Sequence, residues 1–216
     1  MLSLVNIAPL QQLRERFGDA LSVQEYGKEE LSKIIKDKPL GMHALGGNIW
    51  NRIVTRQWAK VDPMQLSGHF QRQDPKIHAA IRKVIGEEVI RDIRMVKAWR
   101  GVPRKTNLVM ELVVADVYRD ELHLGDVTFC DPDRPIKPAD RVYELQTHKG
   151  LGLFGVLIKN MEAYARDRGY GQLTLTAGNA DLVPLFRQHG FEVEDNVAGR
   201  TGLLAGMSIP MERVVP

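Results

Sequence analysis

Three apolar segments separated by short polar turns are the feature that most restricts the fold of this chain. Residues 93–99 (IRMVKAW), 107–117 (NLVMELVVADV) and 121–129 (ELHLGDVTF) are rich in Val and Leu and alternate or run apolar, as strands do. The sequences VPRK (102–105) and YRD (118–120) between them are typical of turns. Consecutive strands joined in this way predict an antiparallel meander in the middle of the chain.

The segments that follow the meander mix helix and strand. Residues 131–140 contain three prolines and predict a loop, and residues 141–147 predict a further extended stretch. Residues 156–170 carry apolar side chains at helical spacing, and Gly169 is a good terminator of that helix. The remaining elements are a strand at 172–179, a short helix at 181–190, a strand at 191–195 and a last strand within 203–215. The order predicts an α/β fold.

The N-terminal region, residues 1–90, predicts mostly helices and is followed by a core at 91–216. A short strand is expected at 2–8 and a helix at 9–19, with Pro9 near its start and Gly18 near its end. Apolar side chains at helical spacing predict three further helices, at 28–37, 48–60 and 75–90. Whether this region is part of the same domain as the core stays open at this level.

The composition excludes several classes of protein. The single cysteine, Cys130, rules out an internal disulfide framework and any Cys-based zinc site, and the six histidines show no ligand spacing, so no metal is expected. The first residues do not form a signal peptide, and no apolar run approaches the length of a membrane span. We therefore expect a cytoplasmic protein with no membrane partner.

The charge is unevenly distributed along the chain. Residues 1–105 contain 19 Lys and Arg against 11 Asp and Glu, whereas residues 106–216 contain 11 against 16. Arg52, Arg56 and Lys60 recur at four-residue spacing beside two tryptophans, a pattern that suits either nucleic-acid contact or a solvated helix face. The solvated face is the more common of the two, and in either case this stripe is a candidate acceptor contact.

A glycine-rich stretch, QTHKGLGLFG (146–155), stands between the predicted extended stretch and the helix after it. Gly-x-Gly at a strand-to-helix junction exposes backbone N–H groups and the positive end of the helix dipole, which together bind a phosphate. The stretch does not match the dinucleotide fingerprint, because Phe154 stands where that motif has its third glycine, and no Gly-Lys-Ser/Thr follows for a P-loop. A plain structural turn is the alternative.

The residues around the glycines resemble the GNAT superfamily of acyl-CoA-dependent N-acyltransferases. THKGLG (147–152) stands in the frame of the family signature Arg/Gln-x-x-Gly-x-Gly/Ala, and Asn179, Phe186, Gly190 and Phe191 follow at the family's spacing. The resemblance covers residues 141–195 best. It implies a mixed, mostly antiparallel central sheet flanked by helices, with residues 1–90 as a helical elaboration, and acetyl-CoA or another acyl-CoA as co-substrate.

The resemblance also assigns candidate binding residues. The loop would hold the pyrophosphate of coenzyme A, with Lys149 as counter-charge, while Asn179 and Phe186 would line the thiol. The full set of candidate cofactor-binding residues is Gln146, Thr147, His148, Lys149, Gly150, Leu151, Gly152, Asn179 and Phe186. Two positions depart from the family: Thr147 replaces Arg or Gln, and Phe186 stands where a Tyr often protonates the departing thiolate.

Transfer of an acyl group to an amine needs a base, because only the neutral amine attacks a thioester. A carboxylate on the meander near the loop could take the proton. The best candidates are Asp126 and Glu144, and Glu121 and Glu111 are further possibilities. His123 is expected to be an ordinary exposed or hydrogen-bonded histidine, and Cys130 a small buried side chain rather than a nucleophile.

We therefore expect an acyltransferase, most simply an acetyltransferase, that acts on an amine by direct attack. Two alternatives remain open: a GNAT-like transferase that modifies a DNA base or tRNA through the basic half of the chain, and a non-catalytic relative that binds CoA or a partner. The acceptor and the oligomeric state, a homodimer included, are not defined by the sequence.

Overall fold

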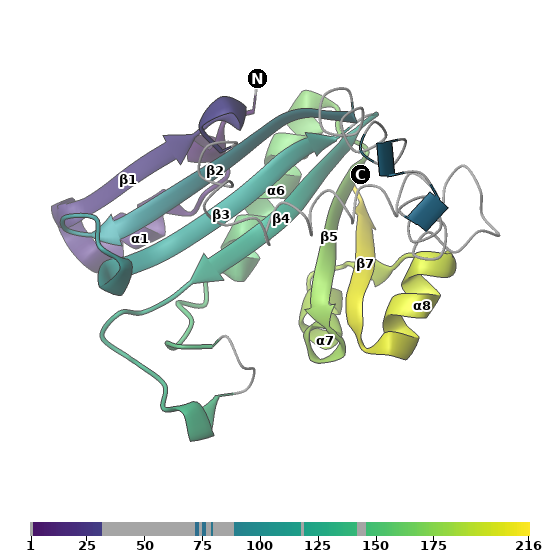
Figure 1. The fold of residues 1–216 in the computed structure, drawn as a ribbon. Coiled ribbons are helices and arrows are strands. Elements are labelled where there is room, and N and C mark those ends of the chain that lie inside the picture. Colours follow the sequence, from purple (N-terminus) through teal and green to yellow (C-terminus); the bar gives the residue numbers. More distant parts are fainter. Residues whose placement is uncertain are drawn as a thin grey trace.

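The computed structural model describes residues 2–31, 72–73, 75–76, 79, 89–117, 119–141 and 146–216. The described residues form a seven-stranded sheet of order β1-β2-β3-β4-β5-β7-β6 (Figure 1). The strands are β1 (Leu21–Tyr26), β2 (Ile90–Arg100), β3 (Leu108–Val117), β4 (Glu121–Phe129), β5 (Gln172–Asn179), β6 (Glu192–Val193) and β7 (Met207–Val214).

Only one neighbouring pair in this sheet is parallel. Strands β1 to β4 pair antiparallel in chain order, β4 pairs parallel with β5, and β7 pairs antiparallel with both β5 and β6. The α-helices whose bounds lie within the described residues are α1 (Leu10–Phe17), α6 (Phe154–Arg168), α7 (Val183–Arg187) and α8 (Val197–Ala205). The α/β fold predicted by the GNAT resemblance, with a mixed and mostly antiparallel sheet flanked by helices, is confirmed.

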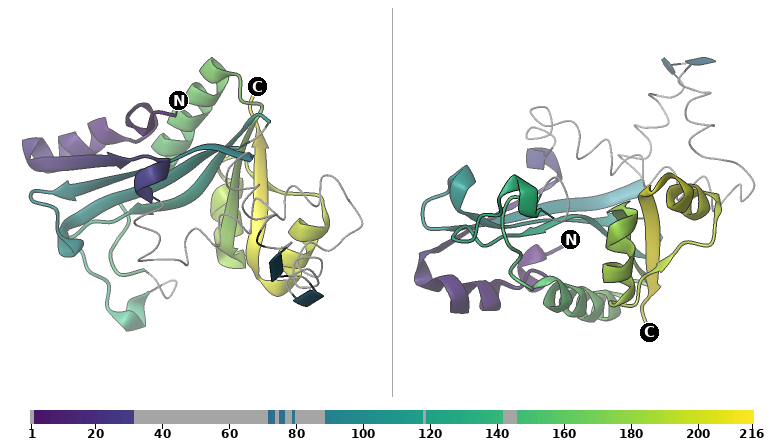
Figure 2. Two further views of the ribbon diagram at one scale, coloured as in Figure 1. Left: turned by 45° about the horizontal axis from the view of Figure 1, so that its top comes forward. Right: turned by 90° about the horizontal axis from the view of Figure 1, so that it is seen from below.

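Helices α1 and α6 cover the same face of the sheet (Figure 2). Side chains of both helices, such as Leu13 and Leu157, share one buried cluster with Leu112 and Val114 of β3. Residues of β3 that alternate with these two, such as Ala115, belong to a second and smaller cluster with Leu31. Because alternate residues of a strand point to opposite faces, apolar side chains pack on both faces of the sheet in the described residues. Each large apolar side chain buried here contributes roughly 2 kcal/mol.

The regular elements of the core agree with the sequence. The predicted meander is confirmed as β2, β3 and β4, and the predicted strand at 121–129 has the bounds of β4. The helix expected at 9–19 is α1, which ends at Gly18, where φ is 70°. The helix expected at 156–170 is α6, and its C-cap is Gly169 in the left-handed region.

Three expectations were wrong or incomplete. Residues 2–8 do not form a strand; Leu4–Asn6 is a 3-10 turn, because Leu4 and Ile7 are buried together at the spacing of a helical turn. Strand β1 was not predicted, and it makes part of the N-terminal region an edge of the sheet. Helix α8 was also missed, so the last strand begins later than expected, at Met207.

The other predicted N-terminal helices lie mainly outside the described residues. Residues 28–31, 72–73, 75–76 and 79 are helical, and the segment expected to be a helix at 75–90 ends in β2, which begins at Ile90. The helix expected at 48–60 lies entirely outside them. Among the helices that the structure describes, none has the length and apolar character needed to cross a membrane.

Candidate active site

The candidate site begins where the two parallel strands separate. Strands β4 and β5 pair from Glu121↔Gln172 to Leu124↔Leu175, after which β4 continues beside β3 and β5 continues beside β7. The register between β3 and β4 shifts by one residue at this point, which leaves Gly125 as the extra residue of a bulge. A bulge bends its strand and increases the local twist, so it turns the second half of β4 away from β5 (Figure 1).

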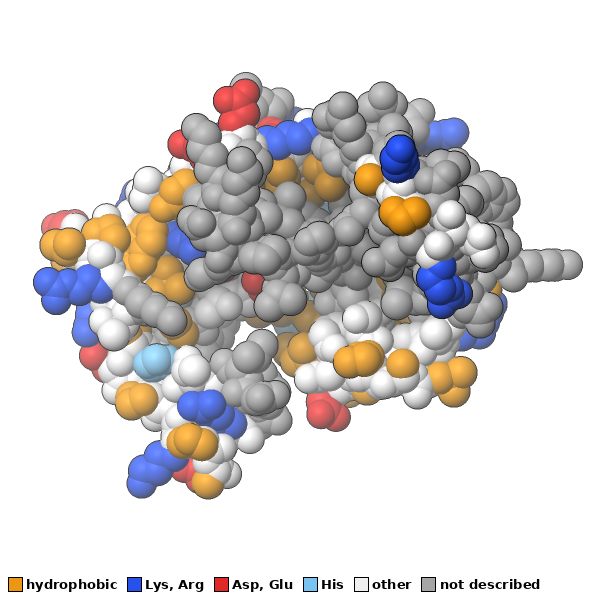
Figure 3. Space-filling model, viewed as in Figure 1, with side chains coloured by type: hydrophobic (Ala, Val, Ile, Leu, Met, Phe, Trp, Pro, Cys, Tyr) orange, Lys and Arg blue, Asp and Glu red, His pale blue; other side chains and the backbone are white. Residues whose placement is uncertain are grey.

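A cleft of about 400 Å³ lies in this opening. Its walls come from the second half of β4, from the glycine loop that precedes α6, and from α7. Figure 3 shows the surface hollowed between the lobe that contains the β3–β4 side of the sheet and the lobe that contains α7 and α8. The lining residues are Asp126, Val127, Thr128, Phe129, Cys130, Gln146, Thr147, His148, Gly150, Leu151, Gly152, Leu153, Phe154, Leu182, Leu185 and Phe186.

The glycine loop lies against the end of β4 and leads into α6. Gly152 has φ of 72°, in the left-handed region that other residues avoid, and α6 begins two residues later at Phe154. Gly150 lies close to the backbone of Phe129, whose carbonyl oxygen would be 3.8 Å from an added Cβ. The first N–H groups of α6 have no partner within the helix, so together with the helix dipole they favour an anion at this end of the cleft.

A long segment, residues 131–149, separates β4 from the glycine loop in the sequence; we call it the β4 excursion. Its two arms are joined at their base by backbone hydrogen bonds. The N–H of Asp131 donates to the carbonyl of Lys149 (2.9 Å), and the N–H of Lys149 donates to that of Arg134 (2.9 Å). The excursion therefore leaves the end of β4 and returns to it, which places the glycine loop beside Phe129.

Ion pairs attach the excursion to the rest of the protein. The buried carboxylate of Asp131 pairs with Arg16 of α1 at 2.6 Å, and Asp133 pairs with Arg100 of β2. A further ladder contact joins the N–H of Ile136 to the carbonyl of Thr147 at 2.9 Å. Helix α1 thus stabilises the segment that forms one wall of the cleft.

Asp126 lies on β4 just beyond the bulge, with its side chain at the cleft. The residue is exposed on one side, yet protein atoms on its other sides limit the hydration of the carboxylate, and this burial raises its pKa above the ordinary value. The Glu111 carboxylate raises the pKa of Asp126 further, whereas the backbone N–H of Val127 and the Lys97 ammonium lower it. A carboxylate with a raised pKa is a stronger proton acceptor than an ordinary one.

The cleft brings together eight of the predicted site residues, and two further predicted residues, Asn179 and Lys149, are described but do not line it. Asn179 ends β5 and caps the following 3-10 turn, where its side chain accepts from the N–H of Leu182 at 3.2 Å, and it does not line the cleft. Lys149 is exposed beside the cleft without lining it. Glu144, Arg52, Arg56 and Lys60 lie outside the described residues.

Phe186 is a buried part of the cleft wall. Its ring packs against that of Phe154 with centroids 5.5 Å apart, so α7 and the start of α6 meet through aromatic side chains. A phenylalanine has no proton to donate, so this position cannot serve as a general acid.

His123 behaves as expected, whereas Cys130 is half-buried and lines the cleft. His123 is buried, and its Nδ1 lies 2.8 Å from the Thr174 hydroxyl across the parallel pair, so it is a hydrogen-bonded core residue. The Cys130 thiol donates to the carbonyl of Leu108 at 2.8 Å, and burial together with the nearby Asp131 raises its pKa, which disfavours the thiolate. Glu121 is buried at the opposite end of β4 from the cleft.

The sequence did not identify Thr128 and Phe154 as lining residues, or Lys97 as a neighbour of the site. Thr128 could have been found, because it is two residues beyond Asp126 and so shares its face of β4. Lys97 becomes a neighbour only through the register of β2 with β3, which no local pattern reveals. Among the described residues, no group of His, Cys, Asp or Glu is placed to hold a metal ion.

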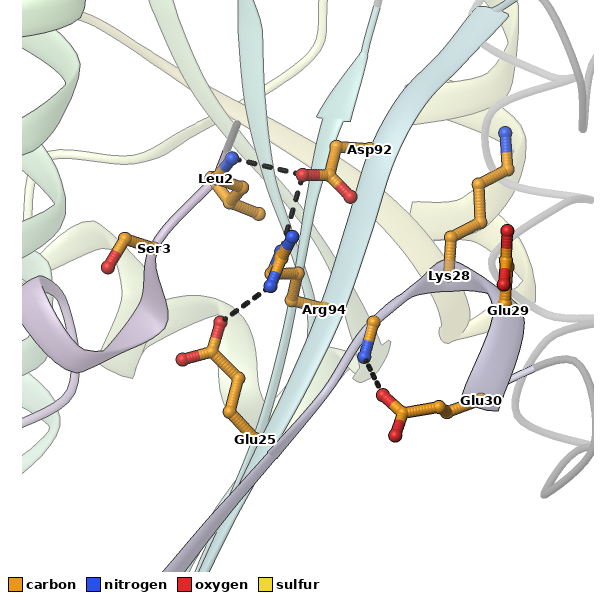
Figure 4. Close-up of a pocket in the computed structure, with 9 residues that line it drawn as sticks. Leu2, Ser3, Glu25, Lys28, Glu29, Glu30, Asp92 and Arg94 are labelled. Carbon is orange, nitrogen blue, oxygen red and sulfur yellow. Dashed lines mark hydrogen bonds and ion pairs between the residues drawn. The ribbon is translucent and has the colours of Figure 1, made fainter.

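A larger hollow, of about 890 Å³, lies beside β1, β2 and the first residues of the chain (Figure 4). Its charged groups bind one another or the backbone: Asp92 accepts from the Leu2 N–H at 3.0 Å and from Arg94 at 3.3 Å, Arg94 also donates to Glu25 at 3.3 Å, and Lys28 and Glu30 bond to the backbone. These contacts use the polar groups that a ligand would need. The smaller cleft is therefore the better candidate site.

Comparison with known proteins gives structural relatives only. No protein-family model matches the sequence, and no curated protein matches it. A nourseothricin acetyltransferase is 21% identical over 57% of this chain and 66% of that chain, just under two thirds of its length, with a TM-score of 0.34. The PaiA N-acetyltransferase of Thermoplasma acidophilum, solved with coenzyme A, is 12% identical over 90% of this chain and 98% of that chain (TM-score 0.35).

Ard1 of Thermoplasma volcanium is 11% identical over 91% of this chain and 99% of that chain, with a TM-score of 0.37. The chain resembles the GNAT N-acetyltransferases. This likeness concerns the fold, and nothing about the acceptor follows from it.

Proposed function

We propose that the protein transfers an acetyl group from acetyl-CoA to an amine. The observation that carries this proposal is the cleft itself, which combines three features. Two parallel strands diverge at a bulge, a glycine loop and a helix N-terminus lie at one end, and a carboxylate of raised pKa lies on one wall. A long, narrow thioester with a phosphate end fits such a site.

Each part of the cleft has a physical role in this proposal. The backbone N–H groups of Gly150, Leu151 and Gly152 and the N-terminus of α6 bind the pyrophosphate, and Lys149 supplies a cation nearby. Beyond Leu124 the edge of β4 that faces β5 is no longer in the ladder, so its backbone groups are available to the amide groups of the pantetheine arm. The apolar side chains of Leu182, Leu185 and Phe186 form the opposite wall.

The chemistry follows from the position of Asp126. The amine of the acceptor loses its proton to the Asp126 carboxylate, directly or through one water, and its nitrogen attacks the thioester carbonyl carbon. A new C–N bond forms, the C–S bond breaks, and CoA leaves as a thiolate that takes a proton from water or from the acceptor ammonium. Proton removal of this kind contributes roughly 10²- to 10⁴-fold to a rate. Glu144, the second predicted base, remains a proposal.

Calorimetry with acetyl-CoA and with CoA tests the binding step. Binding of both at micromolar concentration is expected, together with turnover of acetyl-CoA in the presence of an amine acceptor drawn from a panel of small amines, peptides and tRNA. Asp126→Asn should keep the affinity for acetyl-CoA and lower kcat at least tenfold. Absence of binding at millimolar acetyl-CoA would eliminate the proposed function.

Phe186 favours a second candidate, a protein that binds CoA without catalysing transfer, because the buried ring offers no acid to the departing thiolate. Binding of CoA without turnover on any acceptor of the panel would support this candidate. The net positive charge of the first half of the chain keeps a nucleic-acid acceptor in the panel. A steep loss of acceptor affinity with added salt would then identify such an acceptor.

A further inference from the structure

Three charged side chains stand on three neighbouring strands beside the cleft. Asp126 of β4 is opposite Val113 of β3, and Glu111 of β3 is opposite Lys97 of β2. Residues 111 and 113 are two apart on β3 and so point to the same face of the sheet. Asp126, Glu111 and Lys97 therefore share that face. This is the face opposite to α1 and α6, because Leu112 and Val127 point into the cluster formed by those helices.

The Lys97–Glu111 pair is close and partly shielded. Lys97 Nζ and Glu111 Oε2 are 2.6 Å apart, and the two side chains are 18% and 25% exposed. Glu111 is diagonal to Asp126 across the β3–β4 pair, at a separation of roughly 7 to 8 Å that long side chains can bridge. Lys97 is one strand further away. Within the pair, the Glu111 carboxylate on β3 is therefore nearer to Asp126 than the Lys97 ammonium on β2.

We propose that Lys97 and Glu111 are positioning residues for Asp126, and that together they set the charge state in which Asp126 meets the acceptor amine. This inference rests on the proposed function, in which Asp126 is the base. Neither Lys97 nor Glu111 lines the cleft, so they act on the reaction through Asp126 and not through the substrates.

Electrostatics explains why the pair is needed in this form. The Glu111 carboxylate opposes ionisation of Asp126 and so raises its pKa, while the more distant Lys97 opposes that effect only in part. Of the described residues, these two are the charged groups that act on Asp126, and the N–H of Val127 on its own strand is the remaining polar influence. Without Lys97, the Glu111 carboxylate would raise the pKa of Asp126 unopposed. Without Glu111, the unpaired Lys97 ammonium would lower the pKa of Asp126 and make it a weaker base.

Two substitutions that preserve volume separate this role from a structural one. Glu111→Gln removes the nearer negative charge and leaves Lys97 to stabilise the Asp126 carboxylate, so the acid limb of the pH–rate profile should move to lower pH. Lys97→Met removes the positive charge, so the acid limb should move to higher pH. Each shift is expected to be roughly 0.5 to 1 pH unit at low ionic strength and to shrink with added salt.

The experiment measures kcat/KM against pH for wild type, both single variants and the Lys97→Met/Glu111→Gln double variant, with the carboxyl ¹³C resonance of Asp126 titrated in parallel by NMR. Opposite shifts of the acid limb and of the NMR pKa in the two single variants are the expected result. Loss of rate in both variants without opposite shifts would overturn the inference while leaving the proposed function in place.

Variants that unfold are recognised by their NMR spectra. The double variant retains neither charge and serves as a further folded comparison. Its Asp126 pKa should lie between those of the folded single variants. A wild-type protein that shows no turnover on any acceptor would refute the proposed function. The NMR titration would still decide whether the pair controls Asp126.

Discussion

Gly150→Ala separates the binding role of the glycine loop from its folding role. In the structure, an alanine Cβ at this position would meet one atom within 4 Å, the carbonyl oxygen of Phe129 at 3.8 Å, which is an ordinary contact. Gly150 is not among the glycines with positive φ, so an alanine there is not strained. Replacing glycine under these conditions stabilises a protein by about 0.4 to 1 kcal/mol, because the unfolded chain loses freedom.

The effect on ligand binding should be opposite in sign. A methyl group on the cradle keeps the pyrophosphate from the backbone N–H groups, and each hydrogen bond to a charged group is worth about 1.5 to 3 kcal/mol. Loss of one such bond corresponds to a dissociation constant for acetyl-CoA raised roughly ten- to hundredfold. Gly150→Ala should thus be at least as stable as wild type in urea denaturation and bind acetyl-CoA much more weakly in calorimetry.

The chain offers a matched control in Gly27. An added Cβ there would also meet a single oxygen at 3.8 Å, that of Glu30, and Gly27 too is absent from the residues with positive φ. Gly27 lines the larger hollow and not the cleft. Gly27→Ala should therefore change stability by a similar amount and leave binding unchanged. Wild-type affinity for acetyl-CoA in Gly150→Ala would refute the idea that a phosphate contacts this backbone.

Three further predictions concern other residues. Gly199→Ala should lower the free energy of unfolding by about 2 to 3 kcal/mol, measured by urea denaturation. The added Cβ would overlap the carbonyl oxygen of Glu194, a backbone atom that cannot move freely. Unchanged stability would contradict the packing of α8. Phe186→Tyr should raise kcat several-fold at unchanged KM for acetyl-CoA, because it adds an acid to the cleft wall, and a lower kcat would argue against thiolate protonation there. Asp126→Asn should stabilise the protein above the raised pKa of Asp126: the folded state binds this proton more tightly than the unfolded state, so the ionised carboxylate costs stability at neutral pH. That gain should disappear as the pH falls below the ordinary value of 3.8, and a gain that persists at pH 3 would contradict it.

The fold could be predicted wherever one period dominates the sequence. Strand β3 is largely buried and contains a long run of Val and Leu, and the buried first half of β4 contains two leucines in alternation, so both segments predict strands. Strand β1 was missed because it is an edge strand of intermediate burial whose polar and apolar residues differ little from those of a loop.

Helix α8 was missed although its ends are marked. Asn196 caps the helix by accepting from the N–H of Gly199 at 2.9 Å, and Gly206 ends it in the left-handed region. The sequence predicts one strand within 203–215, and α8 takes the first residues of that segment. Two glycines inside the helix, Gly199 and Gly202, weaken its helical signal, and both are required because a Cβ at either would press on backbone atoms.

The glycine loop and Asp126, both of which line the cleft, could be named from the sequence because spacing along one chain determines them; their roles belong to the proposed function. Residues that join the site by pairing could not be, since a cross-strand neighbour depends on register. Lys97 and Asp126 are related through two strand pairings, Lys97↔Glu111 and Val113↔Asp126, and a register slip of one residue in β4 would place Asp126 on the opposite face. Cross-strand neighbours of this kind become known only from the structure.

The β4 excursion gives Thr147 a structural role at the position where the GNAT signature has Arg or Gln. The sequence predicts an extended stretch at 141–147 that leads into the glycines. Residues 142–145 lie outside the described part of the chain, and the glycines lie beside the end of β4 at Phe129. Closing a loop of this length costs little more than closing a short one, and the hydrogen bonds at its base fix both arms. Thr147 belongs to that base: its carbonyl accepts from Ile136, and its hydroxyl lies 2.9 Å from His148 Nδ1. Both of these polar groups of Thr147 therefore have partners within the excursion, so in the proposed function the phosphate contacts belong to the backbone of the glycines, with Lys149 as the nearby cation.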